Sequence, residues 1–161
     1  MKIIDRELIL NRLYEHEWPY ASNVNPLALQ EMTNRIARTG RLGSSLISYS
    51  NLVSGITFQF PNVQNNMPFV IDVRNWEGLH RRIVGDCLGY ISFISYKEHD
   101  FMASSLVAGI TTNKPSDIFF EWMKSLGAIE NLTEKSIDEF WIDQVKKSVA
   151  WYKKNPNGFF I

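Results

Sequence analysis

Hydrophobic residues recur at helical spacing along residues 75–110, the longest such pattern in the chain. The pattern predicts a long helix with one apolar face that ends near the polar residues 97–100. Its apolar stripe comprises Trp76, Leu79, Ile83, Cys87, Ile94 and either Tyr90 or Ile91. Residues 104–110 are rich in small and β-branched side chains and lie between polar turns, so they predict a buried strand.

Two helices are predicted in the first 40 residues. The first opens the chain and must end before Pro19, because the residue before a proline disfavours helical geometry. The second covers residues 26–39. Asn25 can cap its start, a proline suits its first position, and Gly40 can follow its last residue.

Two shorter helices are bounded by a serine and a glycine. Residues 49–54 follow Ser48, whose hydroxyl can cap a helix, and a glycine comes directly after them. Residues 117–126 follow Ser116 and end at Gly127. Both segments are therefore expected to be helical.

The last helix is predicted to open at a capping box formed by Ser136 and Glu139, and to stop at the turn 155–158. Its apolar stripe comprises Ile137, Phe140, Trp141, Val145, Ser148 and Tyr152. The three apolar residues 159–161 follow the turn. They are expected either to fold back onto the core or to mark a partner surface, and ordinary burial favours folding back.

A β-hairpin is predicted from residues 56–60 and 69–73, where apolar and polar residues alternate on either side of a turn-rich segment. No repeat or long linker divides the chain. The expected fold is α+β: a single helix-dominated domain over residues 1–161, with a hairpin and one buried strand.

The charge balance weakens a nucleic-acid interpretation. Lysine and arginine together number 17, as do aspartate and glutamate, so any basic patch must be local. Ten phenylalanines and five tryptophans are many for 161 residues, and large aromatics are enriched at the centres of protein interfaces. We therefore expect a protein partner or self-association.

Neither a membrane span nor a metal site is expected. No segment approaches the ~20 apolar residues that a spanning helix needs. The single cysteine, Cys87, excludes an internal disulfide and suits a reducing, cytoplasmic location. His16, His80 and His99 are too far apart in sequence to form a recognisable zinc motif, and no cofactor motif is present.

DNA association is a second prediction. A helix, a turn, a short helix and a hairpin follow one another in the order of a winged helix. The arginines before the turn could meet phosphate, and the start of the short helix could meet bases. The DNA-contact candidates are Arg35, Arg38, Arg41, Tyr49, Ser50 and Asn51.

Residues 35–41, RIARTGR, and residues 47–53, ISYSNLV, resemble the winged-helix part of the DNA alkyltransferase-like proteins. The resemblance covers about 20 residues and implies the winged-helix shape alone. It does not extend to alkyl transfer, because Cys87 does not lie in a Pro-Cys-His-Arg motif. The segments LVAGI, KPSDIFF and DEFW also resemble uncharacterised bacterial proteins, which implies no function.

A small hydrolase is a third prediction. Glu98 and His99 are adjacent and could supply acid-base chemistry, with Ser104 as a nucleophile if the fold joins them. Adjacent helical side chains point apart, however, and no Gly-x-Ser-x-Gly motif is present. A solvated helix end explains the same residues.

The preferred prediction is a non-catalytic binding module that acts as a subunit or regulator in a protein complex. It follows from the neutral charge, the surplus of aromatics and the lack of a convergent catalytic set. The partner-surface candidates are Trp141, Trp151, Phe159 and Phe160.

Overall fold

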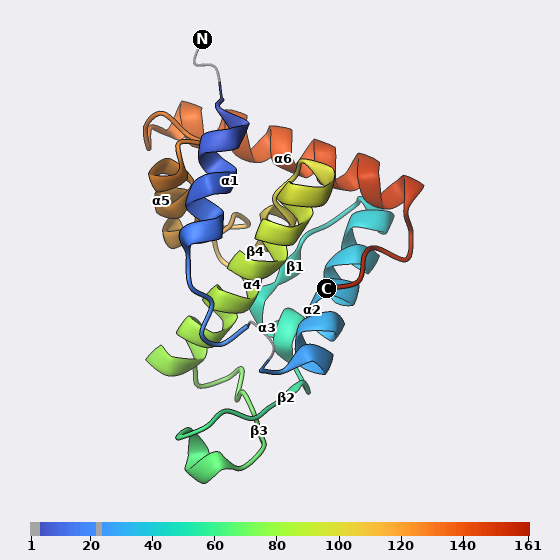
Figure 1. Cartoon of the computed structure of the whole chain (residues 1–161). Helices are drawn as coiled ribbons and strands as arrows, with labels where there is room; N and C mark the ends of the chain where they lie inside the picture. The colour runs from blue at the N-terminus through green and yellow to red at the C-terminus, as the bar shows by residue number, and fades with distance from the viewer. Residues whose placement is uncertain (1–3, 22–23) are drawn as a thin grey trace.

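Helices dominate the computed structural model, which describes residues 4–21 and 24–161 (Figure 1). The α-helices are α1 (Arg6–Glu15), α2 (Pro26–Leu42), α3 (Tyr49–Val53), α4 (Gly78–His99), α5 (Asp117–Leu126) and α6 (Glu134–Lys154). Short 3₁₀ turns occupy η1 (Gln64–Asn66) and η2 (Ala103–Leu106). Among the described residues no helix is both long and apolar enough to cross a membrane.

The strands are short and form two separate pairs. They are β1 (Ile47–Ser48), β2 (Thr57–Phe58), β3 (Phe69–Val70) and β4 (Val107–Ala108). β1 pairs with β4 in parallel, and β2 pairs with β3 as the predicted antiparallel hairpin. The helix-dominated α+β prediction is therefore confirmed at this level.

The predicted long helix, α4, belongs to two apolar clusters. Ile83 and Ile91 pack in a cluster with residues of α2, α3 and the hairpin. Phe93 and Tyr96, nearer the end of α4, pack in a second cluster with residues of α1 and α5. Figure 1 shows α4 running between α1 on one side and α2 on the other. α4 thus holds the two halves of the core together.

Several helix ends match their local signals, and two predicted ends were wrong. The Ser48 hydroxyl accepts a hydrogen bond from the backbone N–H of Asn51, as a cap should. α2 continues through Gly40 to Leu42, and the residue that follows its end is Gly43, whose φ is +69°. α6 begins at Glu134, two residues before Ser136, because Thr133 caps it instead.

The predicted strand over residues 104–110 is mostly wrong. Only β4 is extended, and the residues before it form η2. The reason is that side chains bind consecutive backbone amides in this segment. Gln144 accepts from the Met102 N–H at 2.8 Å, Ser95 from the Ala103 N–H at 3.0 Å, and Ser92 from the Ser104 N–H at 3.0 Å. These bonds hold η2 in a turn against α4 and α6.

Candidate functional site

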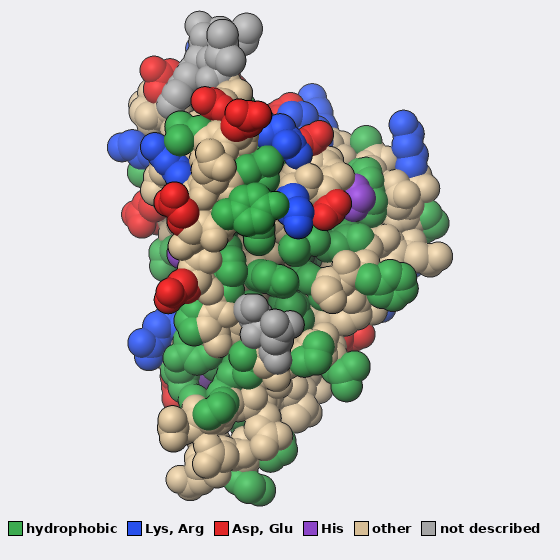
Figure 2. Space-filling view, viewed as in Figure 1, with side chains coloured by type: hydrophobic (Ala, Val, Ile, Leu, Met, Phe, Trp, Pro, Cys, Tyr) green, Lys and Arg blue, Asp and Glu red, His purple; other side chains and the backbone are tan. Residues whose placement is uncertain are grey.

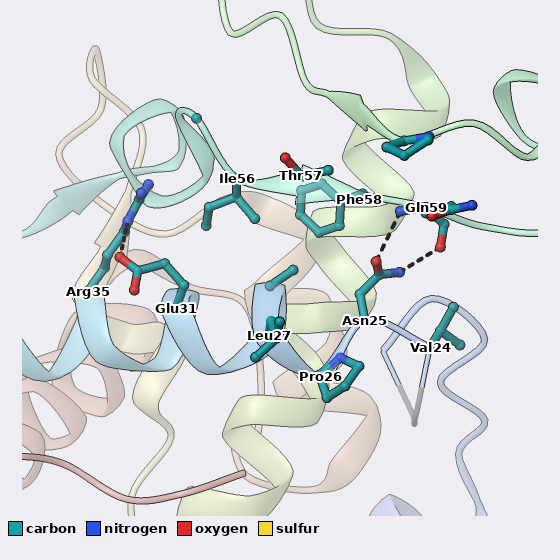
Figure 3. A pocket seen from close by; sticks show the side chains of 13 residues that line it. Val24, Asn25, Pro26, Leu27, Glu31, Arg35, Ile56, Thr57, Phe58 and Gln59 are labelled. Atoms are coloured by element: carbon teal, nitrogen blue, oxygen red, sulfur yellow. Dashed lines mark hydrogen bonds and ion pairs between the residues drawn. The ribbon is translucent and has the colours of Figure 1, made fainter.

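A groove of about 470 Å³ lies between the N-terminal half of α2 and strand β2 (Figure 3). Its base includes Ile56 and Phe58, which are buried. Leu27 reaches it from α2, although 86% of this side chain is exposed. The groove is therefore apolar between its two ends and open to solvent.

Asn25 joins the two walls at one end of the groove (Figure 3). Its side-chain amide donates to the Gln59 carbonyl at 2.9 Å and accepts from the Gln59 N–H at 3.0 Å. Asn25 was predicted as the cap of α2, but its side chain makes no capping bond there. It binds the strand instead and fixes the spacing between α2 and β2.

Glu31 and Arg35 of α2 line the other end, and Arg38 follows them on the same helix. The Glu31 carboxylate accepts from Arg35 at 3.0 Å and from Arg38 at 3.3 Å. Partial burial on its own raises the pKa of Glu31, but the two arginines outweigh it and the net pKa lies below the ordinary value. Glu31 is therefore held ionised, which suits an ion pair and not a general acid.

The DNA-contact candidates do not form one exposed set. Arg35 donates to the carbonyl oxygens of residues 51, 52 and 54, at the C-terminal end of α3. Its guanidinium therefore joins α2 to α3 within the protein. The Tyr49 hydroxyl accepts from the Ser116 N–H at 2.9 Å. Arg38, Arg41 and Asn51 are exposed and Ser50 is half-buried. α3 has five residues, so it offers little surface to a groove of DNA.

The predicted acid-base residues are not joined by any contact within the described residues. Ser104 is buried, and its hydroxyl lies 2.6 Å from that of Ser92. The His99 ring instead packs against Trp151 at a tilt of 32°, with ring centroids 4.2 Å apart. The Glu98 carboxylate is 3.7 Å from the Lys97 ammonium. Across residues 4–21 and 24–161, no three histidine, cysteine or acidic side chains converge as a metal site would need.

Of the four partner-surface candidates, three pack against the chain itself. The Trp141 indole N–H donates to the Ser105 carbonyl at 2.9 Å. The Phe159 ring lies 6.0 Å from that of Trp151, and both residues are half-buried. Phe160 is the exception, since 93% of its surface is exposed.

A single glutamine fixes the chain on both sides of Phe160. The Gln30 amide donates to the Phe159 carbonyl at 3.2 Å and accepts from the Ile161 N–H at 3.0 Å. The expected folding back of residues 159–161 is therefore correct for the backbone but wrong for Phe160. Sequence reasoning missed Gln30, because its partners lie about 130 residues away and leave no local signal.

A comparison with protein-family models, curated proteins and solved structures finds no match for this chain. Two features of the fold are candidates for function: the groove between α2 and β2, and the residues that hold Phe160.

Proposed function

We propose that this protein is a non-catalytic binding module that attaches to a protein partner through Phe160 and the apolar surface around it. The observation that carries the proposal is the contrast between an ordered backbone and an exposed ring. Gln30 bonds the chain on either side of Phe160, yet the ring is 93% exposed.

The ordered backbone around Phe160 lowers the conformational entropy that is lost when a partner binds. Burying a phenylalanine side chain contributes roughly 1.5–3 kcal/mol, but ordering a flexible segment opposes it. Here two hydrogen bonds order the backbone before any partner arrives. Phe160 can therefore act as an anchor, the kind of residue that dominates interface energies.

The surroundings of this segment supply further apolar area. Hydrophobic side chains gather over α4, between α1 and the C-terminal residues (Figure 2). The shared edge of α1 and α4 contributes Tyr14, which is 59% exposed and stands edge-on to Phe93 with ring centroids 5.0 Å apart. Exposed apolar side chains of this kind are typical of surfaces that bind a protein partner.

Neither alternative gains comparable support. The DNA-binding prediction loses Arg35 and Tyr49, which are engaged in the fold, and keeps Arg38, Arg41, Ser50 and Asn51. The hydrolase prediction needs a contact between His99 and Ser104, and these residues bind other groups. Both remain predictions.

Site-specific photo-crosslinking tests the proposal. Phe160 is replaced by the benzophenone analogue of phenylalanine in the full chain, expressed in its native host. We expect irradiation to join the chain to one defined protein, or to a second copy of itself. The change Gln30→Ala should lower the crosslinking yield several-fold, because it frees the backbone while leaving residue 160 unchanged.

Ile118 supplies the matched control, since it is also apolar and 74% exposed but lies on α5. The same analogue at residue 118 should give only scattered products. Equal crosslinking from positions 160 and 118 would contradict the proposal.

A further inference from the structure

We infer that the groove between α2 and β2 receives an extended segment of a polypeptide partner, which pairs with the free edge of β2 as an added strand. The inference shares the protein-binding class of the function proposed above but uses a different surface. Phe160 and Gln30 take no part in it.

The direction of the β2 backbone follows from its neighbours. Gln59 turns both its N–H and its C=O toward Asn25, on the α2 side. The register sets Phe58 opposite Phe69, so Gln59 faces Pro68, which has no N–H to donate to it. Backbone groups alternate in direction along a strand, so Thr57 points the same way as Gln59, into the groove.

The backbone groups of Thr57 are unpaired on that side. Within residues 4–21 and 24–161, no loop or side chain makes a hydrogen bond to its N–H or C=O. Asn25 satisfies the equivalent groups of Gln59, two residues further along. The Asn25 side chain thus pairs with the backbone groups of Gln59, whereas those of Thr57 have no partner among the described residues.

The unpaired N–H and C=O of Thr57 indicate which kind of ligand the groove would bind. An added strand would place one residue opposite Thr57 and exchange both hydrogen bonds with it, as the Asn25 amide does with Gln59. Leu27 and Ile56 line the space beside this edge, so apolar side chains of the segment would lie against them. A volume of about 470 Å³ is within the usual range for bound ligands.

A peptide selection tests the inference. Random linear heptapeptides displayed on phage are selected against the immobilised full chain, and the enriched peptides are synthesised. We expect Thr57→Pro, which removes the N–H that faces the groove, to weaken their binding at least tenfold in fluorescence anisotropy. N-methylation of the peptide should weaken binding at alternate positions only, as strand pairing requires.

Val70→Pro is the matched control. Val70 lies opposite Thr57 in the hairpin, so its N–H points to the outer edge, away from the groove. This variant should bind the peptides within twofold of the unchanged protein. Phe160→Ser should do so as well, which separates this site from the function proposed above.

Three outcomes would overturn the inference. The selection could enrich no peptide, the two proline variants could bind equally well, or the protein alone could form a dimer that Thr57→Pro abolishes. The last result would make a second copy of the chain the occupant of the edge.

Discussion

Tyr152 shows how tightly individual residues constrain one another where α2 meets α6. Its side chain is fully buried, and a Cβ placed on Gly40 would lie 2.3 Å from the tyrosine ring. Only glycine therefore fits at residue 40 without moving the ring. Among the described residues the Tyr152 hydroxyl has no hydrogen-bond partner, and burial raises the pKa of Tyr152.

Tyr152→Phe should leave stability unchanged or raise it by about 1 kcal/mol, because a buried hydroxyl without a partner is unfavourable. Gly40→Ala should lower stability by roughly 1–3 kcal/mol through overpacking. Urea unfolding monitored by circular dichroism measures both. A clear loss of stability in Tyr152→Phe would mean that the hydroxyl has a partner in solution.

At the scale of elements, η2 is held by the side chains of two helices. Ser92 and Ser95 of α4 and Gln144 of α6 bind successive amides of residues 102–104. The chain thus passes from α4 into β4 through a buried turn with satisfied backbone groups. This turn also sets the position at which β4 meets β1.

Gln144→Leu keeps much of the side-chain volume but removes the acceptor for the Met102 N–H. Leaving this buried donor unpaired should lower the free energy of unfolding by about 1–3 kcal/mol. Lys146→Ala, on the exposed side of the same helix, should change it by less than about 0.5 kcal/mol. Equal effects of the two variants would show that the bond to Met102 stabilises little.

The elements that could be predicted are those with local signals. Ser48 and Gly127 mark the helix ends that the structure has, because caps and left-handed glycines act within a few residues. Gly40 was assigned wrongly, because its role is set by Tyr152 and not by its neighbours. The strand prediction over residues 104–110 included part of η2, because small, apolar residues lead there into Val107 and Ile110. The side chains of α4 and α6 that bind the backbone amides of this segment leave no local signal in it.

The candidate site was harder to predict than the fold. Both of its features depend on an amide side chain that binds backbone far away in sequence, Asn25 to residue 59 and Gln30 to residues 159 and 161. Phe160 is a partner-surface candidate from the sequence because it lies in the run of three apolar residues 159–161. Trp141, by contrast, lies against Ser105, which only the packing of α6 reveals.

At the scale of the whole molecule, buried groups that stay neutral determine how stability varies at high pH. Burial, with a smaller contribution from the charge of Asp86, raises the pKa of the Cys87 thiol from 9.0 to about 12. Burial also raises the pKa of Tyr152. Both groups favour the folded state while they are neutral, and both lie in the cluster that joins α4 to α2 and α6.

Below about pH 9 these two groups should therefore cause no change in the free energy of unfolding. The free energy of unfolding should fall as the pH rises from 9 toward 12. In that range the unfolded chain loses protons that the folded chain keeps. The urea midpoint measured at pH 8 and at pH 10.5 should show the decline. The double variant Cys87→Ala, Tyr152→Phe should show a smaller one, and an identical decline would contradict the assignment.

The contact between Gly40 and Tyr152 can form only after residue 152 has been synthesised. The two residues are more than a hundred positions apart, and ribosomes add roughly 5–20 residues per second. The side of α2 that meets Tyr152 therefore emerges several seconds before α6 exists to cover it. A chain that stops short of α6 leaves that side bare, so premature termination late in the message should yield an aggregating product.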